Sequence, residues 1–221
     1  MSSWSDRIWP VDPVLPDTAV VEKAAARILQ GGLGAVPTRG LYGLAADAFR
    51  ESAVARLFAL KGRPADKPVL VLISDPSELD RLVVAVPETG RLLMDRFWPG
   101  RLTLVLPARP EVPTALTAGT GKIGVRLCGH PVARMLAAAA GGPVTGTSAN
   151  RSGGPGCHRI DDLDPEVARG VDFILDAGPL AGGPGSTVVD VCGDRPEVLR
   201  EGAASRGELA EALVEILGET G

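Results

Sequence analysis

The segment KGRPADKPVLVLI, residues 61–73, places three cationic side chains directly before an apolar run. Upstream, residues 52–60 carry apolar side chains at helical spacing, and residues 68–73 form a run typical of a buried strand. Cations at the mouth of a buried strand suit a polyphosphate, because arginine can bridge two oxygens and lysine adds a compact charge. A loop whose charges are simply solvated is the alternative. The segment therefore predicts a helix–loop–strand unit with a candidate anion site.

The rest of the chain alternates in the same way. Helices are expected at residues 17–30, 76–83, 88–97, 131–140 and 207–217, and short strands at 33–37, 102–106, 123–127, 144–147, 173–175, 187–191 and 198–200. This order predicts one α/β (α+β) domain, with a twisted mixed parallel and antiparallel sheet flanked by helices. Residues 1–16, rich in Ser, Trp, Pro and Asp, are expected to form an irregular N-terminal arm, and residues 17–221 the domain.

Composition limits the possible functions. The chain has 221 residues and a formal net charge of −4, which argues against a protein that coats nucleic acid by bulk charge. Cys128, Cys157 and Cys192 are odd in number and far apart, so we expect neither a disulfide framework nor a metal site, and a cytoplasmic location. The most apolar stretch, residues 135–140, is too short to cross a membrane.

A second polar segment, TSANRSGG at residues 147–154, also follows a short apolar run. Hydroxyl and amide groups at the end of a strand often bind ligands in α/β sheets, although a serine or Asx turn is the alternative. Arg126 and Arg200 lie at the ends of two further expected strands, where they could bind a ligand or remain surface charges. The usual catalytic motifs give no competing site, because His130 and His158 are the only histidines and no Walker motif occurs.

Seven short motifs occur in order along almost the whole chain. They are PTxxxYGL at 37–44, KGRP at 61–64, FWPGxLT at 97–103, VR at 125–126, TSANxSG at 147–153, STVVD at 186–190 and LRxG at 199–202. Each motif alone is weak, but the set in register is specific. Together they resemble the YrdC-like family, which includes threonylcarbamoyl-adenylate synthases and their YciO-type relatives.

The resemblance implies a YrdC-like (YrdC/RibB-type) fold with a positively charged concave face. It also implies a nucleotidyltransferase that joins L-threonine, bicarbonate and ATP, with Mg²⁺, into threonylcarbamoyl-AMP and pyrophosphate for the t6A modification of tRNA. Two alternatives stay open. One is a YciO-type paralogue with a different substrate, and the other is a module that binds double-stranded RNA or tRNA without synthase activity.

The resemblance also assigns roles to residues. The catalytic set would be Lys61, Arg63, Ser148 and Asn150. The nucleotide would be bound by Arg63, Lys67, Ser148, Asn150, Gly156 and Arg200. The amino acid would be bound by Thr38, Gly40, Tyr42, Arg126, Gly146 and Ser186, and no metal ligand is expected in the protein.

Three positions depart from the synthase pattern. Gly40 stands where synthases typically carry a second threonine, Leu72 where some carry a substrate-contacting histidine, and Lys122 where a threonine often precedes the Val-x-Val-Arg strand. A site built to bond a hydroxyl group can discriminate strongly, so the loss of such groups matters. These departures predict an intact nucleotide side and an altered amino-acid side.

Overall fold

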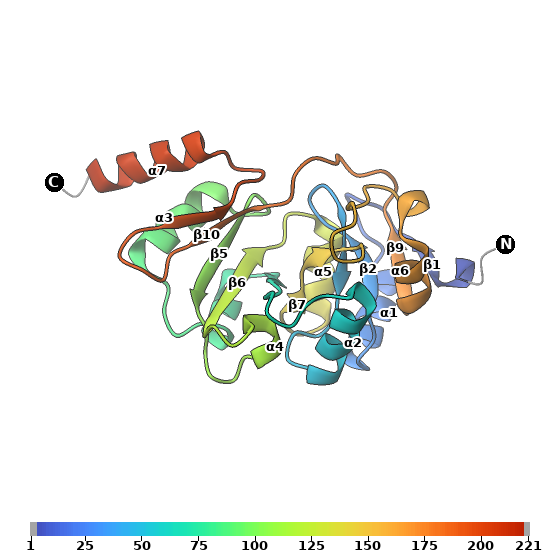
Figure 1. Cartoon of the computed structure of the whole chain (residues 1–221). Coiled ribbons are helices and arrows are strands. Elements are labelled where there is room, and N and C mark those ends of the chain that lie inside the picture. The colour runs from blue at the N-terminus through green and yellow to red at the C-terminus, as the bar shows by residue number, and fades with distance from the viewer. Residues whose placement is uncertain (1–3, 219–221) are drawn as a thin grey trace.

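Two mixed sheets lie side by side in the computed structural model, which describes residues 4–218 (Figure 1). The first sheet has the strand order β1 (Ile8–Pro10), β9 (Phe173–Asp176), β2 (Gly34–Pro37), β3 (Tyr42–Ala45) and β8 (Thr147–Ser148). The second has the order β11 (Glu197–Arg200), β10 (Thr187–Asp190), β5 (Leu102–Pro107), β6 (Lys122–Leu127), β4 (Val71–Ile73) and β7 (Val144–Thr145).

Parallel and antiparallel pairs occur in both sheets, which confirms the mixed α/β architecture. In the first sheet, β9 runs parallel to β1 and β2, whereas β3 runs antiparallel to β2 and β8. In the second, β10 pairs with β5 and β4 with β6 in parallel, and the remaining pairs are antiparallel. The strands nevertheless divide between two sheets, which corrects the expectation of one sheet.

Gly146 explains this division. The expected strand at residues 144–147 is split there, so that β7 pairs with β4 in the second sheet and β8 pairs with β3 in the first. The Gly146 amide donates to the Leu70 carbonyl oxygen at 2.8 Å. A Cβ atom on residue 146 would lie 2.6 Å from side-chain atoms of both Leu70 and Leu72, so the crossing requires glycine.

Most of the expected helices form. They are α1 (Thr18–Leu29), α2 (Glu51–Lys61), α3 (Glu88–Phe97), α5 (Pro131–Ala139) and α7 (Arg206–Gly218), whereas residues Pro76–Arg81 form the 3-10 helix η2. The sequence did not predict the short helices α4 (Thr114–Thr117) and α6 (Pro165–Gly170), or the 3-10 turns η1 (Ser5–Arg7) and η3 (Ile160–Asp162). In the part of the chain that the structure describes, no helix is long and apolar enough to cross a membrane.

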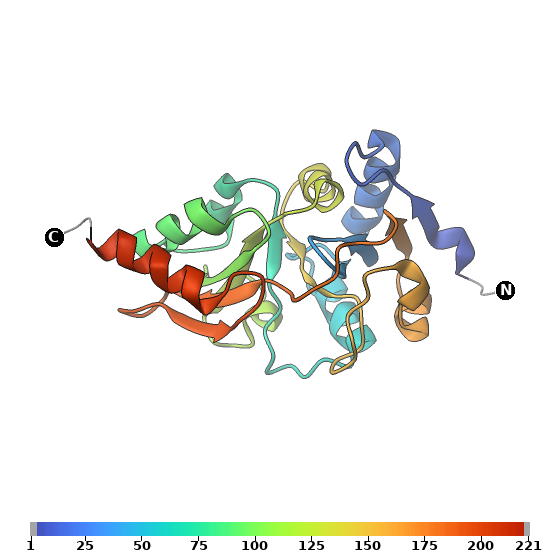
Figure 2. The ribbon, with the colours of Figure 1, turned by 90° about the horizontal axis from the view of Figure 1, so that it is seen from above.

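The helices pack over two apolar cores. The smaller core joins α1 and α5 to the buried sides of β2, β9 and β4, including Phe173 and Leu72. The larger core contains α2, α3 and the central strands of the second sheet, including Leu57, Leu93 and Val125. Figure 2 shows α7 lying beside α3 at the outer side of the second sheet. Each core contains residues from both sheets, such as Leu44 of β3 in the larger core and Leu72 of β4 in the smaller one, so the two cores hold the sheets together.

The N-terminal arm is partly regular, which corrects the expectation of an irregular segment at residues 1–16. Ile8–Pro10 form β1 and pair with the edge of β9. The Trp9 ring stacks on Phe173 with centroids 5.3 Å apart, and the Lys23 ammonium lies 3.9 Å above the Trp9 ring. Without β1, the edge of β9 would have unpaired backbone groups, and the Phe173 ring would lack its stacking partner. Docking of this segment on β9 therefore lowers the free energy more than exposure of the segment to water does. Residues 1–3 and 219–221 of the expected arm and domain lie outside the described residues.

Candidate functional site

A cavity of about 620 Å³ opens between the two sheets. The β2–β3 turn, the loop after α2 and the segment at β8 form its wall on one side. The inner faces of β5, β6, β10 and β11 form the wall on the other side. The lining includes many of the residues that the sequence singled out: Thr38, Gly40, Tyr42, Arg63, Arg126, Gly146, Ser148, Ser186 and Arg200. Residues up to 162 positions apart in the chain thus meet at one site.

Four of the expected site residues do not line this cavity: Lys61, Lys67, Asn150 and Gly156. The Lys67 side chain is exposed on the loop after α2. Gly156 is exposed and faces Leu41, since a Cβ atom there would lie 2.9 Å from the Leu41 side chain. Lys61 and Asn150 are buried behind the wall, and their contacts explain how that wall is held.

Lys61 is the last residue of α2, and its side chain is only 2% exposed. Its ammonium group donates to the carbonyl oxygens of Ser148 and Asn150, both at 2.6 Å. Burial, and next the neighbouring charge of Arg63, lower the pKa of Lys61 to about 8. Lys61 therefore ties the end of α2 to the backbone of the Ser148–Asn150 segment, and the solvated-loop alternative is wrong for this residue.

Asn150 closes the loop that follows. Its side-chain amide donates to the carbonyl oxygens of Arg151 at 2.7 Å and Gly154 at 2.6 Å. Its Oδ1 atom is buried without a hydrogen-bond partner among the residues described. The Ser152 amide also donates to the Lys61 carbonyl oxygen at 2.8 Å, so the loop is fastened to α2 from both directions. Asn150 thus makes the local side-chain-to-backbone bonds that were the structural alternative for this segment.

Arginine side chains give the cavity its positive charge, since Arg39, Arg63, Arg126 and Arg200 line it beside Lys122. Arg126 is 9% exposed, and its Nε atom is buried with no partner in the described part of the chain. Burial lowers the pKa of Arg126 to about 10, and burial followed by the charge of Arg200 lowers that of Arg63. Arg200 donates to the Ser186 carbonyl oxygen at 2.8 Å. At neutral pH Arg63 on one wall and Arg126 and Arg200 on the other therefore bring like charges to one cavity, an arrangement that a bound anion would stabilise.

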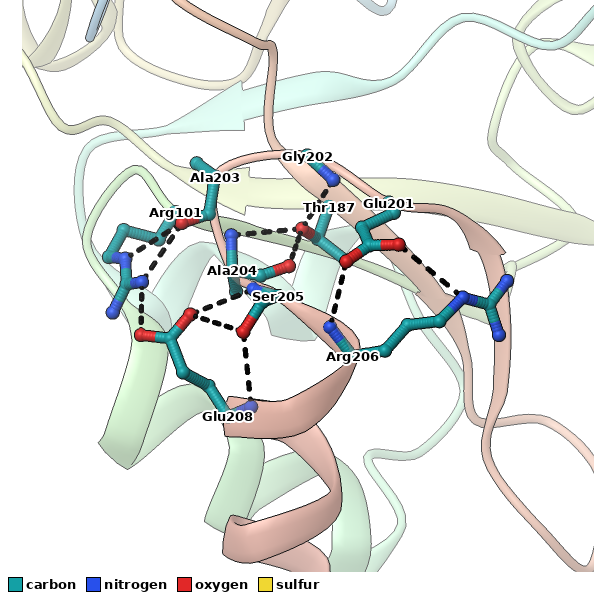
Figure 3. Close-up of polar contacts among 9 residues, drawn as sticks. All are labelled: Arg101, Thr187, Glu201, Gly202, Ala203, Ala204, Ser205, Arg206 and Glu208. Atoms are coloured by element: carbon teal, nitrogen blue, oxygen red, sulfur yellow. Dashed lines mark hydrogen bonds and ion pairs between the residues drawn. The ribbon is translucent and has the colours of Figure 1, made fainter.

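The turn that follows Arg200 at the end of β11 is fastened by the hydrogen bonds that Figure 3 shows. The Thr187 hydroxyl accepts from the Gly202 amide at 2.9 Å, and Arg101 donates to Glu208 at 2.6 Å. A Cβ atom on residue 202 would lie 2.3 Å from a backbone oxygen, which explains the glycine of the LRxG motif. The roles of Arg101 and Glu208 could not be predicted from the sequence, because nothing in their spacing indicates that β11 and α7 meet the start of β5.

Two hydroxyl groups expected at the amino-acid end are engaged by the protein itself. The Tyr42 hydroxyl donates to the Gly178 carbonyl oxygen at 2.7 Å and accepts from the Ala177 amide at 3.0 Å. Burial raises the pKa of Tyr42 well above its usual value. The Thr38 hydroxyl donates to the Leu41 carbonyl oxygen at 2.6 Å. Both side chains therefore shape the β2–β3 turn at the edge of the cavity.

The remaining departures from the synthase pattern lie in different places. Leu72 does not line the cavity but is buried in the smaller core. It can therefore alter the amino-acid side of the cavity only through its neighbour Gly146, which does line the cavity. Lys122 does line the cavity and pairs with Asp190, with the ammonium nitrogen 2.7 Å from the carboxylate oxygen. The hydrogen bond that Lys122 donates to Asp190 is the main cause of the raised pKa of Lys122. Asp190 is the one carboxylate among the lining residues, and the side chains that the structure describes, residues 4–214, form no cluster of acidic, cysteine or histidine residues that could hold a metal ion.

Comparison with known proteins gives close matches. The family model Sua5_yciO_yrdC, described as "Telomere recombination", matches residues 26–202. The threonylcarbamoyl-AMP synthase of Bacillus subtilis is 38% identical over 199 residues, which cover 88% of this chain and 56% of the relative. The crystal structure of Pyrococcus abyssi Sua5 complexed with L-threonine is 36% identical with a TM-score of 0.87, and the match covers 93% of this chain and 60% of that one. E. coli YciO is 27% identical with a TM-score of 0.81, covering 91% and 96%.

The chain thus spans less than two thirds of the length of the synthase and of Sua5, but nearly all of YciO. The two-sheet architecture agrees with the structural matches, and all seven motifs lie within the residues that the family model matches. The family model covers most of the chain, from the second half of α1 to the turn after β11. This chain therefore belongs to the Sua5/YciO/YrdC family.

Proposed function

We propose that the cavity binds ATP, bicarbonate and L-threonine and forms threonylcarbamoyl-AMP and pyrophosphate. The observation that carries this proposal is the arginine-rich wall that Arg39, Arg63, Arg126 and Arg200 form around the cavity, where the one carboxylate among the described lining residues is already paired. Such a wall suits a substrate set with several anionic groups. The names of the B. subtilis relative and of the threonine-bound P. abyssi structure support the same reaction.

The chemistry needs charge stabilisation more than it needs a strong nucleophile. The threonine amine takes up the carbon of bicarbonate with loss of water, and the resulting carbamate oxygen attacks the α-phosphorus of ATP. Pyrophosphate leaves as the new P–O bond forms, so negative charge grows on the phosphate oxygens. Fixed guanidinium groups already placed around those oxygens lower the barrier without having to reorganise. A chain with two histidines can therefore perform this reaction.

The residues divide between the two ends of the cavity. We assign Arg63, Arg200 and Ser148 to the phosphates: Arg63 and Ser148 lie on the wall fastened by Lys61, and Arg200 lies on the facing wall beside the turn after β11. We assign Arg126 and Ser186 to the amino acid, because the buried Arg126 Nε has no partner among the described residues and can pair with a carboxylate. Lys61, expected to be catalytic, acts in this proposal as a positioning residue, because both of its bonds go to backbone oxygens.

Mg²⁺ would enter with ATP. The cavity wall offers only Asp190, whose carboxylate is paired with Lys122, so the lining does not make a protein ligand set for a divalent cation. The triphosphate oxygens would supply the ligands, which is the usual way that magnesium is bound at nucleotide sites. Its contribution would be to neutralise the charge of the leaving pyrophosphate.

The experiment that tests the proposal measures pyrophosphate release from ATP, Mg²⁺ and bicarbonate, with and without threonine. We expect release that depends on threonine and that falls sharply in Arg126→Met. Binding of ATP to that variant, measured by calorimetry, should stay intact, because Arg126 belongs to the amino-acid end. A wild-type protein that binds ATP but releases no pyrophosphate with threonine would refute the synthase proposal.

A second candidate is a YciO-type activity on another carbamoylated or adenylated substrate. It is favoured by Gly40, which lacks the side-chain hydroxyl that synthases typically carry at this position, and by the match to nearly the full length of E. coli YciO. A panel of amino acids in the same assay distinguishes the two candidates. Release with an amino acid other than threonine would support the second.

Two further expectations stay predictions. Contact with tRNA or double-stranded RNA would give an affinity that falls steeply with salt, as phosphate contacts do. A cytoplasmic location is expected from the three unpaired cysteines, Cys128, Cys157 and Cys192.

A further inference from the structure

The segment that joins β9 to β10, residues 177–186, crosses from the first sheet to the second over the β2–β3 turn, and we call it the strap. Figure 1 shows it in orange between the two halves of the molecule. Its last three residues, Pro184, Gly185 and Ser186, line the cavity. The course of the strap therefore sets one wall of the proposed amino-acid end.

Both ends of the strap are fastened. At its start, the Tyr42 hydroxyl bonds the backbone of Ala177 and Gly178, and the Leu180 amide donates to the His158 carbonyl oxygen at 2.7 Å. At its end, the Ser186 hydroxyl lies 2.7 Å from that of Thr103. Only the middle, around residues 181–184, is free of such side-chain anchors within the described residues. The exception is a long bond from the Arg39 guanidinium to the Pro184 carbonyl oxygen at 3.4 Å.

The middle of the strap rests directly on Gly40. The Gly182 amide donates to the Gly40 carbonyl oxygen at 2.9 Å. A Cβ atom on residue 40 would lie 2.3 Å from the Gly182 carbonyl oxygen, closer than real Cβ atoms approach backbone. Gly182 itself has a φ of +70° and Gly183 a φ of +83°, a conformation that favours glycine. The observed course of the strap thus depends on a residue without a side chain at position 40.

Resting on the proposed function, we propose that Gly40 is a positioning residue that sets amino-acid selectivity through the strap. Because Gly182 occupies the space of a side chain on residue 40, the strap lies closer to the β2–β3 turn than any other residue there would allow. To reach 3.0 Å from a Cβ atom, the Gly182 oxygen would have to move by about 0.7 Å. Ser186 follows four residues later, so this shift is transmitted to the cavity wall. The amino acid is then selected by the strap end and Arg126, with no side chain from position 40.

The test compares Gly40→Ala with a matched control, Gly193→Ala, whose new Cβ atom would have its nearest neighbour at 3.9 Å. Amide hydrogen exchange at Gly182 reports the seating of the strap without any substrate. We expect exchange at least about tenfold faster in Gly40→Ala, because the hydrogen bond to residue 40 is lost. We also expect kcat/KM for threonine to fall about 10- to 100-fold with the KM for ATP within about twofold, since sub-ångström misplacement near the reacting groups is costly. The control should match the wild type in both measurements.

The outcomes are separable. A folded Gly40→Ala with wild-type exchange at Gly182 and wild-type kcat/KM for threonine would overturn the proposal, and so would an equal loss for threonine and ATP. If Gly40→Ala does not fold, a second variant with one glycine inserted between Gly182 and Gly183 lengthens the strap and leaves Gly40 intact. We expect the same fall in kcat/KM for threonine, with the KM for ATP nearly unchanged. Wild-type kinetics in this variant would overturn the proposal. A wild-type protein without threonine-dependent release refutes the synthase proposal instead, while exchange at Gly182 still decides whether Gly40 seats the strap.

Discussion

Replacing Lys61 by methionine tests the idea that this residue holds the cavity wall. Methionine keeps the volume and the unbranched stem but removes the donors to the carbonyl oxygens of Ser148 and Asn150. The Ser148 oxygen keeps one partner, the Asn150 amide at 2.9 Å, whereas the Asn150 oxygen keeps none that the described residues provide. The substitution therefore leaves one buried acceptor unpaired and another weakened.

The magnitude follows from these two losses. An unpaired buried acceptor costs about 1–3 kcal/mol, and an ordinary hydrogen bond contributes about 0.5–1.5 kcal/mol. Relief of the cost of burying the ammonium group offsets part of this. We expect Lys61→Met to lower the free energy of unfolding by about 2–4 kcal/mol, or the melting temperature by roughly 5–15 °C for a chain of this size.

Urea unfolding followed by circular dichroism measures the effect, with Lys67→Met as the matched control for stability. Lys67 lies six residues further along the same loop and its side chain is exposed, so we expect its substitution to change the free energy by less than about 0.5 kcal/mol. A loss below about 1 kcal/mol in Lys61→Met, with an unchanged dependence on urea, would refute the reasoning.

The same lysine makes a prediction about pH. Its pKa in the folded protein is lowered from 10.5 to about 8, so between these values the unfolded chain binds a proton that the folded protein does not. The contribution of Lys61 to stability therefore rises as the pH increases from about 8 towards 10.5. Tyr42 and the buried thiols titrate in the opposite sense, so the quantity to measure is the difference between the wild type and Lys61→Met across this range.

Three further predictions concern the arginine wall and its supports. Arg126→Lys keeps the charge but removes the guanidinium fork, and threonine-dependent pyrophosphate release should fall at least about tenfold, whereas unchanged kinetics would contradict the role of that fork. Thr187→Val leaves the Gly202 amide without its acceptor, so it should lower the free energy of unfolding by about 1–3 kcal/mol and weaken ATP binding in calorimetry; an unaltered affinity would show that the turn does not position the nucleotide end. The hydrogen bond from Arg101 is the main reason that the pKa of Glu208 falls from 4.5 to about 2. The stabilising effect of the Glu208 carboxylate is therefore complete above about pH 4.5 and is lost as the pH falls towards 2. Acid unfolding of Glu208→Gln should lack this loss of stability between pH 4.5 and 2.

The order of the elements could be predicted because the strands are short apolar runs between helices with clear boundaries. Asp17 at the start of α1 shows this, since its carboxylate accepts from the Ala19 amide at 2.8 Å as a capping residue should. The division into two sheets could not be predicted, because it depends on which distant strand each half of residues 144–147 pairs with. A four-residue run carries no information about partners at positions 43–44 and 71–72.

The candidate site was predicted as a set of residues but not as a geometry. The motifs identified Arg63, Arg126, Ser148 and Arg200, and all four meet at the cavity. The motifs could not show which residues face the cavity and which ones support its wall, because the fold requires a particular residue type at both kinds of position. The contact between Gly40 and Gly182 was inaccessible to sequence reasoning, since it joins two backbone segments 142 positions apart.

The position of Lys61 was nevertheless encoded in the sequence. Val54, Leu57 and Lys61 follow one another at the three- and four-residue spacing of a single helix face, and Ala53 lies beside them. All four residues are buried in α2. A predicted helix that ended at Lys61, one residue later than residue 60, would therefore have placed the ammonium group in the protein interior. A buried ammonium requires oxygen partners, and the carbonyl groups at the end of the Ser148–Asn150 segment are the oxygens that it finds. The pairing of the KGRP and TSAN motifs is thus explained by one buried lysine before any substrate is considered, and this is why the Lys61→Met experiment separates the fold of the wall from its chemistry.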